Sequence, residues 1–266
     1  MSKPTTSSVN NIKPHKWLDM FIWGPSYLCY SIGLPIFLSM QFEKGFASYG
    51  LVFGLLSVLT GQVTTTIFYI LYNEVPINEE LGVLVKNHFS QLEGFLLVGG
   101  YLSTYWISGT MPLTYYQYDG GIIWTHVWYQ LLIQDLLQYT MHRIQHNIPI
   151  LYKYSHVFHH KHIHPTLFDS FDGSILDTTC MILIPLWITS RIINTNVWSY
   201  MVFGTIYSNS LSLIHSQKEF PWDMYFRVFG IGTQYDHHIH HQKFKSNYGH
   251  IFMYWDWVCN TIYSED

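Results

Sequence analysis

The chain has 266 residues, of which 48% are hydrophobic and only 11% are Asp, Glu, Lys or Arg. Soluble domains carry about 25% charged residues, so this deficit argues against an ordinary water-soluble protein and indicates contact with lipid. The formal net charge of −4 and the lack of a basic block exclude a nucleic-acid-binding surface.

The N-terminal half is dominated by apolar stretches that follow a polar tail, predicted over residues 1–17. Each stretch is about 20 residues long, and a helix of that length matches a hydrocarbon core of about 30 Å. We therefore predict an all-α integral membrane protein with about four transmembrane helices, 18–119 forming the purely membrane-embedded part. The four stretches are 18–40, 50–72, 94–116 and 121–139.

Two shorter apolar stretches, 175–189 and 197–214, lie further along the chain and are broken by Pro185 and Gly204. They predict a membrane-associated hairpin over 175–214 that either dips into the bilayer or lies against its surface. Lysines and arginines precede the first stretch and flank the histidine segments, and the positive-inside tendency places both on the cytosolic side. Four crossings return the chain to the side on which it started, and the hairpin returns it there again, which agrees with that orientation.

Histidines are concentrated in three short segments, MHRIQH, SHVFHHKH and YDHHIHHQ, whose spacings are HxxxH, HxxHH and HxxHH. Such spacings place imidazoles on one face of a helix about 5–6 Å apart, so we predict a short helix for each segment. Eight neutral imidazoles exceed the demand of one structural zinc and predict two metal ions, with iron and zinc both possible. The predicted ligands are His142, His146, His156, His159, His160, His237, His240 and His241.

Five residues near these segments are further candidates. His215, at the end of the last apolar stretch, is expected to be another ligand, and His238 a ligand or a neighbour of one. Asp135 continues the helical face of the first segment and is expected to accept a ring N–H from a ligand histidine, unless it is a lone acid facing water. Asn247 and Asp256 are expected to brace a ligand histidine; a helix N-cap is an equal alternative for Asp256.

The remaining histidines are expected to lie outside the site. His162 and His164 precede Pro165, which disfavours helix at the residue before it and ends the second segment there. The others are expected to be structural or exposed: His15, His88, His126 and His250.

The pattern HRIQH, HVFHH and HHIHH, followed by NYG at 247–249 and WDW at 255–257, resembles the fatty acid hydroxylase/sterol desaturase superfamily of membrane di-iron enzymes. The resemblance covers about residues 120–263. Within the superfamily, HSQKEFPWD and QYDHHIHHQKFKSNYG are most similar to the C4-methylsterol monooxygenases, or methylsterol oxidases. The chain departs from that pattern at Asn260, where glycine is usual, and at His238, where aspartate is frequent.

The resemblance implies a catalytic domain over 120–263, in which a helical cap on the cytosolic face of the endoplasmic reticulum membrane holds two iron ions. The implied reaction is an O2-dependent oxidation of the C4-methyl group of a sterol precursor in sterol biosynthesis. Electrons would come from NAD(P)H through a cytochrome b5-type partner, because the chain lacks a GxGxxG dinucleotide-binding fingerprint.

Other substrates and one other class of protein stay open at this point. The same metal pair could serve sterol C5-desaturation, sterol side-chain hydroxylation, or hydroxylation of fatty-acyl or sphingolipid chains. A non-enzymatic membrane metal-binding or transport protein is the alternative of a different class, although transporters usually place polar ligands inside their spans.

Overall fold

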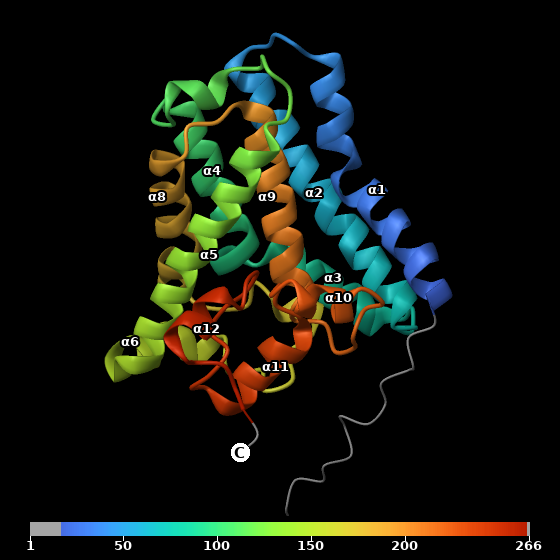
Figure 1. Cartoon of the computed structure of the whole chain (residues 1–266), viewed down its shortest axis with the longest axis vertical. Helices are drawn as coiled ribbons and strands as arrows, with labels where there is room; N and C mark the ends of the chain where they lie inside the picture. Colours follow the sequence, from blue (N-terminus) through green and yellow to red (C-terminus); the bar gives the residue numbers. More distant parts are fainter. Residues whose placement is uncertain (1–16, 265–266) are drawn as a thin grey trace, which may run out of the picture.

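Long helices lie side by side and short ones gather at one end of the computed structural model, which describes residues 17–264 (Figure 1). The predicted helical class is confirmed for these residues. The tail of residues 1–16, with Lys3, Lys13, His15 and Lys16, lies outside the described part. The long elements are α1 (Trp17–Gln41), α2 (Ala47–Tyr72), α4 (Leu97–Ile107), α5 (Trp124–Asn147), α8 (Ile184–Ile192) and α9 (Val197–Leu213).

Two helical segments of the described chain are long and apolar enough to cross a membrane, judged by length and composition: Ala47–Tyr72 and Ile175–Ile192. The outward face of α2 carries Val52, Leu56 and Ile67, each 47–52% exposed. Exposed apolar surface of this extent is rare in water-soluble proteins and fits contact with lipid. The predicted total of four spans and the orientation of the histidine end stay predictions.

The third apolar stretch is shorter than predicted. A π-helical turn, η1 (Leu92–Leu96), leads directly into α4, and the helix then ends at Ile107. The backbone of Gly109 has a φ of +69°, a left-handed conformation that ends a helix, and Pro112 follows closely. A separate 3-10 turn, η2 (Leu113–Tyr116), occupies the rest of the predicted span.

The hairpin over 175–214 also differs from the prediction, because Pro185 and Gly204 do not break it. α7 (Ile175–Thr178), η5 (Thr179–Leu183) and α8 form one helical run, in which the π-helical η5 accommodates the missing N–H of Pro185. α9 runs through Gly204 at the centre of the bundle (Figure 1). Val58 of α2 would lie 3.6 Å from a Cβ at Gly204, which is ordinary van der Waals contact between α2 and α9.

Gly61 makes the contact between α2 and α9 still closer, and Gly61→Ala is expected to destabilise the protein. A Cβ at this position would lie 2.8 Å from Thr205 Cγ2 and 2.9 Å from Asn209 Nδ2, whose side-chain oxygen already accepts a hydrogen bond from Gln62. Overpacking costs about 1–3 kcal/mol, more than the roughly 0.5–1 kcal/mol that alanine gains over glycine in a helix. Thermal unfolding of the purified protein measures the difference.

Gly82→Ala is the matched control for that substitution, because no atom lies within 4 Å of a Cβ built at Gly82 in α3 (Glu79–Ser90). This control is expected to raise the unfolding temperature slightly. Equal stability of the two variants would contradict the close contact between α2 and α9.

The short helices form the end of the molecule that carries the histidines (Figure 1). α5 extends from the bundle into this end, so its last two turns carry His142 and His146. The short helices are α6 (Pro149–Tyr154), α10 (Asp223–Val228), α11 (Gln234–Lys243) and α12 (Tyr254–Cys259).

Candidate metal centre

Two of the three histidine segments are helical as predicted, and the second is not. The first lies on α5 and the third on α11, whose N-terminus is closed by a capping box between Thr233 and Asp236. The second follows the end of α6 at Ser155 and forms a 3-10 turn, His156–Phe158, with further turns after it. The carbonyl of His156 accepts the backbone N–H groups of both His159 and His160, at 3.1 Å, and from His159 on the chain continues as turns rather than as a helix.

The histidines converge in two groups of buried or half-buried rings, and within each group the candidate ligand atoms lie within 4.8 Å of one another. The second and third segments each contribute to both groups, so neither segment supplies ligands to one site alone. The first group is His142, His146, His156, His160 and His240; the second group is His159, His215, His237 and His241.

The spacing of the ring nitrogens fits metal ligation. In the first group, His160 Nε2 lies 3.0 Å from His146 Nε2 and 3.1 Å from His240 Nε2. In the second, His215 Nε2 lies 3.3 Å from His159 Nε2 and 3.1 Å from His237 Nε2. Nitrogens bound to one ion at about 2.0–2.1 Å each would be separated by about 3.0–3.4 Å. The same distances recur in both groups, so each is suited to one ion.

Hydrogen bonds at the opposite ring nitrogen fix the orientation of several rings. The Nδ1–H groups of His142, His215 and His240 donate to the backbone carbonyls of Tyr248 (2.8 Å), Leu211 (2.7 Å) and Ser246 (2.7 Å), respectively. Because a carbonyl only accepts, Nδ1 must carry the proton, and Nε2 is left with the lone pair that a metal needs.

His156 has a stronger orienting partner, the buried carboxylate of Asp177. The Nδ1–H of His156 donates to Asp177 Oδ1 at 2.9 Å, and Gln145 Nε2 donates to the same oxygen at 3.0 Å. A carboxylate behind a histidine raises the basicity of the ligand nitrogen. Among the described residues, the buried Nε2 atoms of His142 and His156 have no hydrogen-bond partner, as expected of atoms reserved for an ion.

Burial keeps these imidazoles neutral. Loss of solvation and the proximity of other imidazoles lower the pKa of His159 to about 4 and hold those of His237, His240 and His241 well below the ordinary value. Only the neutral form can bind a metal, so the groups are poised for ligation without first losing protons at neutral pH.

Asp135 has a different role from the one predicted. Its carboxylate accepts the backbone N–H groups of Ile251 (2.8 Å) and Phe252 (3.1 Å) and the indole N–H of Trp255 (3.0 Å). It therefore anchors the segment after His250 to α5, rather than accepting a ring N–H from a ligand histidine. The partners lie more than 100 residues away in the sequence, beyond the reach of local patterns.

Asp256 and Asn247 also act on backbone rather than on rings. Asp256 accepts the N–H groups of Tyr248 (2.9 Å) and Gly249 (2.7 Å), and so fixes the carbonyl that accepts from His142. Asp256 thus braces a candidate ligand through one intervening residue. The amide of Asn247 donates to the carbonyl of Asp236 at 3.1 Å and accepts from the N–H of Tyr263 at 2.9 Å, which ties the C-terminal segment to α11.

The other histidines are placed as follows. His215, the additional candidate, lies in the second group, whereas His238 lies outside both groups with its Nε2 3.5 Å from the carbonyl of His215. His162 donates to Asp172 at 2.9 Å, and His164 is exposed. Of the four expected to be structural or exposed, His15 lies outside the described residues, and the other three are half-buried or buried: His88, His126 and His250.

Two residues were missed by the sequence analysis. Asp177 could have been noticed as a single acid within an apolar stretch, because ionisable residues in such stretches are often functional. His250 is buried, and its ring centroid lies 4.8 Å from that of His142 and 5.2 Å from that of His237. No spacing rule links it to the three segments.

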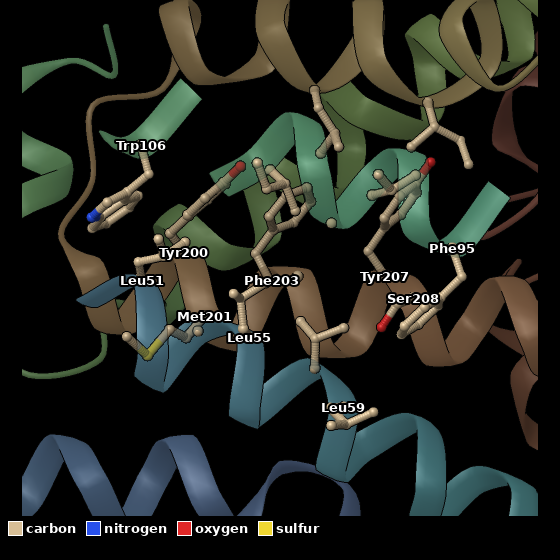
Figure 2. A pocket seen from close by; sticks show the side chains of 18 of the residues that line it. Leu51, Leu55, Leu59, Phe95, Trp106, Tyr200, Met201, Phe203, Tyr207 and Ser208 are labelled. Atoms are coloured by element: carbon tan, nitrogen blue, oxygen red, sulfur yellow. The ribbon is translucent and has the colours of Figure 1, made fainter. Parts of the chain in front are cut away.

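One cavity is lined by histidines, and a second, apolar cavity lies behind it. The smaller, here called the histidine chamber, has a volume of about 40 Å³ and is lined by residues that include His156, His159, His215 and His250. The larger, here called the apolar cavity, has a volume of about 240 Å³ and lies between α2, α4, α8 and α9. Figure 2 shows its side chains, with Trp106 at one end and Phe95 and Tyr207 towards the other.

The helix bundle with apolar outer faces and two histidine groups at one end defines a membrane-associated protein with a candidate two-metal site. The chain belongs to the fatty acid hydroxylase family. The match covers residues 127–261, and this range includes all histidines of both groups. The resemblance seen in the sequence is therefore confirmed.

Several curated proteins are similar to the chain. An alternative squalene epoxidase from Phaeodactylum tricornutum is 42% identical over 80% of this chain and 65% of its own length. A methylsterol monooxygenase from Aspergillus fumigatus is 29% identical over 54% of this chain and 51% of its own length. Methylsterol monooxygenase 1 from Danio rerio is 28% identical over 67% of this chain and 60% of its own length. The chain thus spans about half to two thirds of these relatives, and no solved structure matches it.

Proposed function

We propose that the chain is an O2-dependent membrane oxygenase that epoxidises squalene or a similar polyisoprenoid hydrocarbon. The observation that carries this proposal is the apolar cavity beside the histidines. Most of its few polar groups are already engaged: Trp106 Nε1 donates to the carbonyl of Ala47 (2.6 Å), and the hydroxyls of Tyr207 and Ser208 donate to Gln138 (2.9 Å) and to the carbonyl of Thr205 (3.2 Å). Among the described lining residues, only the Tyr200 hydroxyl has no such partner. A substrate without polar groups suits such a cavity, whereas a buried hydroxyl without a partner would cost free energy.

The similarity to the squalene epoxidase supports the same substrate class. It covers 80% of the chain, whereas the family match covers only residues 127–261, so it includes part of the region that supplies α2 and α4 to the cavity. Oxidation of the C4-methyl group of a sterol, the reaction expected from the histidine-box pattern, is the second candidate. It is favoured by the methylsterol monooxygenases among the relatives.

The two histidine groups would each hold one iron ion; zinc suits the same ligands but is not redox-active. The ions supply O2 activation when bound. The protein's own residues keep the rings neutral and oriented, and the apolar cavity keeps the bound hydrocarbon away from water. In the overall reaction one oxygen atom joins the carbon–carbon double bond, and the other leaves as water with two electrons and two protons. The electrons come from NAD(P)H through an external cytochrome b5-type partner.

We place the protein in the endoplasmic reticulum membrane with the histidine end facing the cytosol. The basic residues that flank the histidine segments support this orientation by the positive-inside tendency. They are Arg143, Lys153, Lys161, Lys218, Arg227, Lys243 and Lys245.

Expression in cells that lack their own squalene epoxidase tests the proposed reaction. We expect the chain to lower accumulated squalene and to form its 2,3-epoxide, measured by mass spectrometry of the extracted lipids, and to require O2. The ligand variant His240→Ala, which disrupts the first histidine group, serves as the inactive control. Unchanged squalene, together with loss of 4,4-dimethylsterols in cells that lack C4-demethylation, would refute epoxidation and establish the second candidate.

A further inference from the structure

The apolar cavity and the histidine chamber share a wall made of three apolar side chains. Phe171, Ile182 and Leu211 line both cavities and are each at most 9% exposed. They come from three separate segments: the loop before α7, the π-helical η5 and the end of α9. Between the cavity and the histidines there is therefore only one layer of side chains.

Phe171 is the member of this wall that is tied most directly to the histidines. Its neighbour Asp172 accepts the Nδ1–H of His159 through its backbone carbonyl (3.1 Å) and the Lys161 ammonium through its carboxylate (2.7 Å). On its other side, a Cβ at Gly94 would collide with the Phe171 carbonyl, so η1 packs directly on this backbone. The backbone at Phe171 is thus held between η1 and a candidate ligand.

The apolar cavity is elongated and extends away from the histidines along α9. Its lining on that helix begins at Val197 and ends at Leu211, fourteen residues later, which corresponds to about 21 Å along the helix axis. Trp106 closes the far end, and its ring would lie 2.7 Å from a Cβ at Gly50 (Figure 2). This shape suits a chain that lies lengthwise with one end directed at Phe171.

The cavity also reaches the outer surface of the bundle. Leu55 and Leu59 of α2 line it and are nevertheless 38% and 42% exposed. Across from them on α4, Gly99 lines the cavity, and no atom lies within 4 Å of a Cβ built there. Between α2 and α4 the cavity is therefore open sideways, at the level where lipid chains would lie.

We propose that a hydrocarbon chain enters sideways between α2 and α4, lies along α9, and passes one end between Phe171, Ile182 and Leu211 into the histidine chamber. These three residues form a gate that positions the reacting bond and so selects which carbons are oxidised. The proposal rests on the proposed function only for the chemical class of the substrate, a long apolar chain.

Photolabelling tests this path independently of turnover. The metal-loaded protein in phosphatidylcholine nanodiscs is irradiated with a linear polyene hydrocarbon that carries a terminal diazirine, and labelled residues are mapped by mass spectrometry. We expect label both on apolar-cavity residues and on residues of the histidine chamber such as Gln138, Met181 and His250.

Two matched pairs of variants separate the entrance from the gate. Gly99→Phe is expected to lose most of the label, whereas Gly100→Phe, one position along α4 and outside the cavity lining, keeps it. Phe171→Trp is expected to confine the label to the apolar cavity and to lower turnover about a hundredfold, a loss typical of a displaced substrate. Phe171→Ala is expected to keep label in the chamber and to oxidise more than one position. Metal content, equal to wild type in all four, reports intact folding.

Equal labelling of Gly99→Phe and Gly100→Phe would overturn the entrance, and chamber labelling that persists in Phe171→Trp would overturn the gate. If the wild-type protein shows the expected labelling and variant dependence but forms no squalene epoxide, the path holds and the proposed reaction fails.

Discussion

His240→Ala and His159→Ala are each expected to abolish product formation, and each is expected to remove metal from a different group. The His240 ring is fixed by its Nδ1–H bond to the Ser246 carbonyl (2.7 Å), with Nε2 3.1 Å from that of His160. His159 is fixed by the carbonyl of Asp172, with Nε2 3.3 Å from that of His215. Each substitution therefore removes one oriented nitrogen from one group.

The expected loss of activity is more than about a hundredfold, because removing only an orienting partner of a ligand already costs 10–100-fold. Metal analysis of each purified variant should show about half of the wild-type iron, since the other group keeps all its ligands. His126→Ala is a suitable control: His126 is also on α5, but its ring contacts Thr195 at 3.1 Å, away from both groups. Full iron content and activity in either ligand variant would refute the assignment of that group.

Asp177→Asn is expected to weaken metal binding by the first group 10–100-fold while the fold stays intact. The substitution keeps the shape of the side chain but removes the negative charge behind His156, whose Nδ1–H donates to Oδ1 at 2.9 Å. The ligand nitrogen of His156 then becomes less basic. Competition with a chelator of known affinity measures the change in metal affinity of each group.

Asp119→Asn removes the same charge from an exposed loop and is the control for that experiment. Asp177→Ala should weaken metal binding more than Asp177→Asn does, because it leaves the buried Nδ1–H of His156 without an acceptor. The loss of that acceptor costs about 1–3 kcal/mol. If chelator competition shows wild-type affinity for Asp177→Asn, the carboxylate has no influence on the metal and only supports local packing.

Spacing along the chain predicted the parts of the site that follow one regular helix. The HxxxH of α5 and the third segment on α11 lie on regular helices as predicted, and both rings of α5 join one group. The helix α11, however, divides its rings: His240 joins the first group, and His237 and His241 join the second. The second segment has the same spacing but lies in consecutive turns, where the period does not apply. His159 joins the second group while His156 and His160 join the first. Since α11 shows the same division, spacing along the chain does not decide which rings share a group.

The supporting contacts could not be predicted because they join distant parts of the chain. Asp135 bonds to Ile251 and Phe252, and Asp177 bonds to His156 only after α6 and the following turns have brought them together. The substrate class could not be predicted for the same reason. The histidine pattern identifies the family, whereas the apolar cavity is built by α2, α4, α8 and α9 and carries no compact motif.

The division of histidine pairs between the two groups constrains how far apart two bound ions can be. His159 and His160 are consecutive yet belong to different groups, and so are His240 and His241. Consecutive Cα atoms are fixed at 3.80 Å by covalent geometry, so each pair joins the two sites through a single rigid peptide unit. The two sites are therefore connected covalently at two places, on separate segments of the chain. These two links would limit how far the two ions could move apart while substrate enters and product leaves.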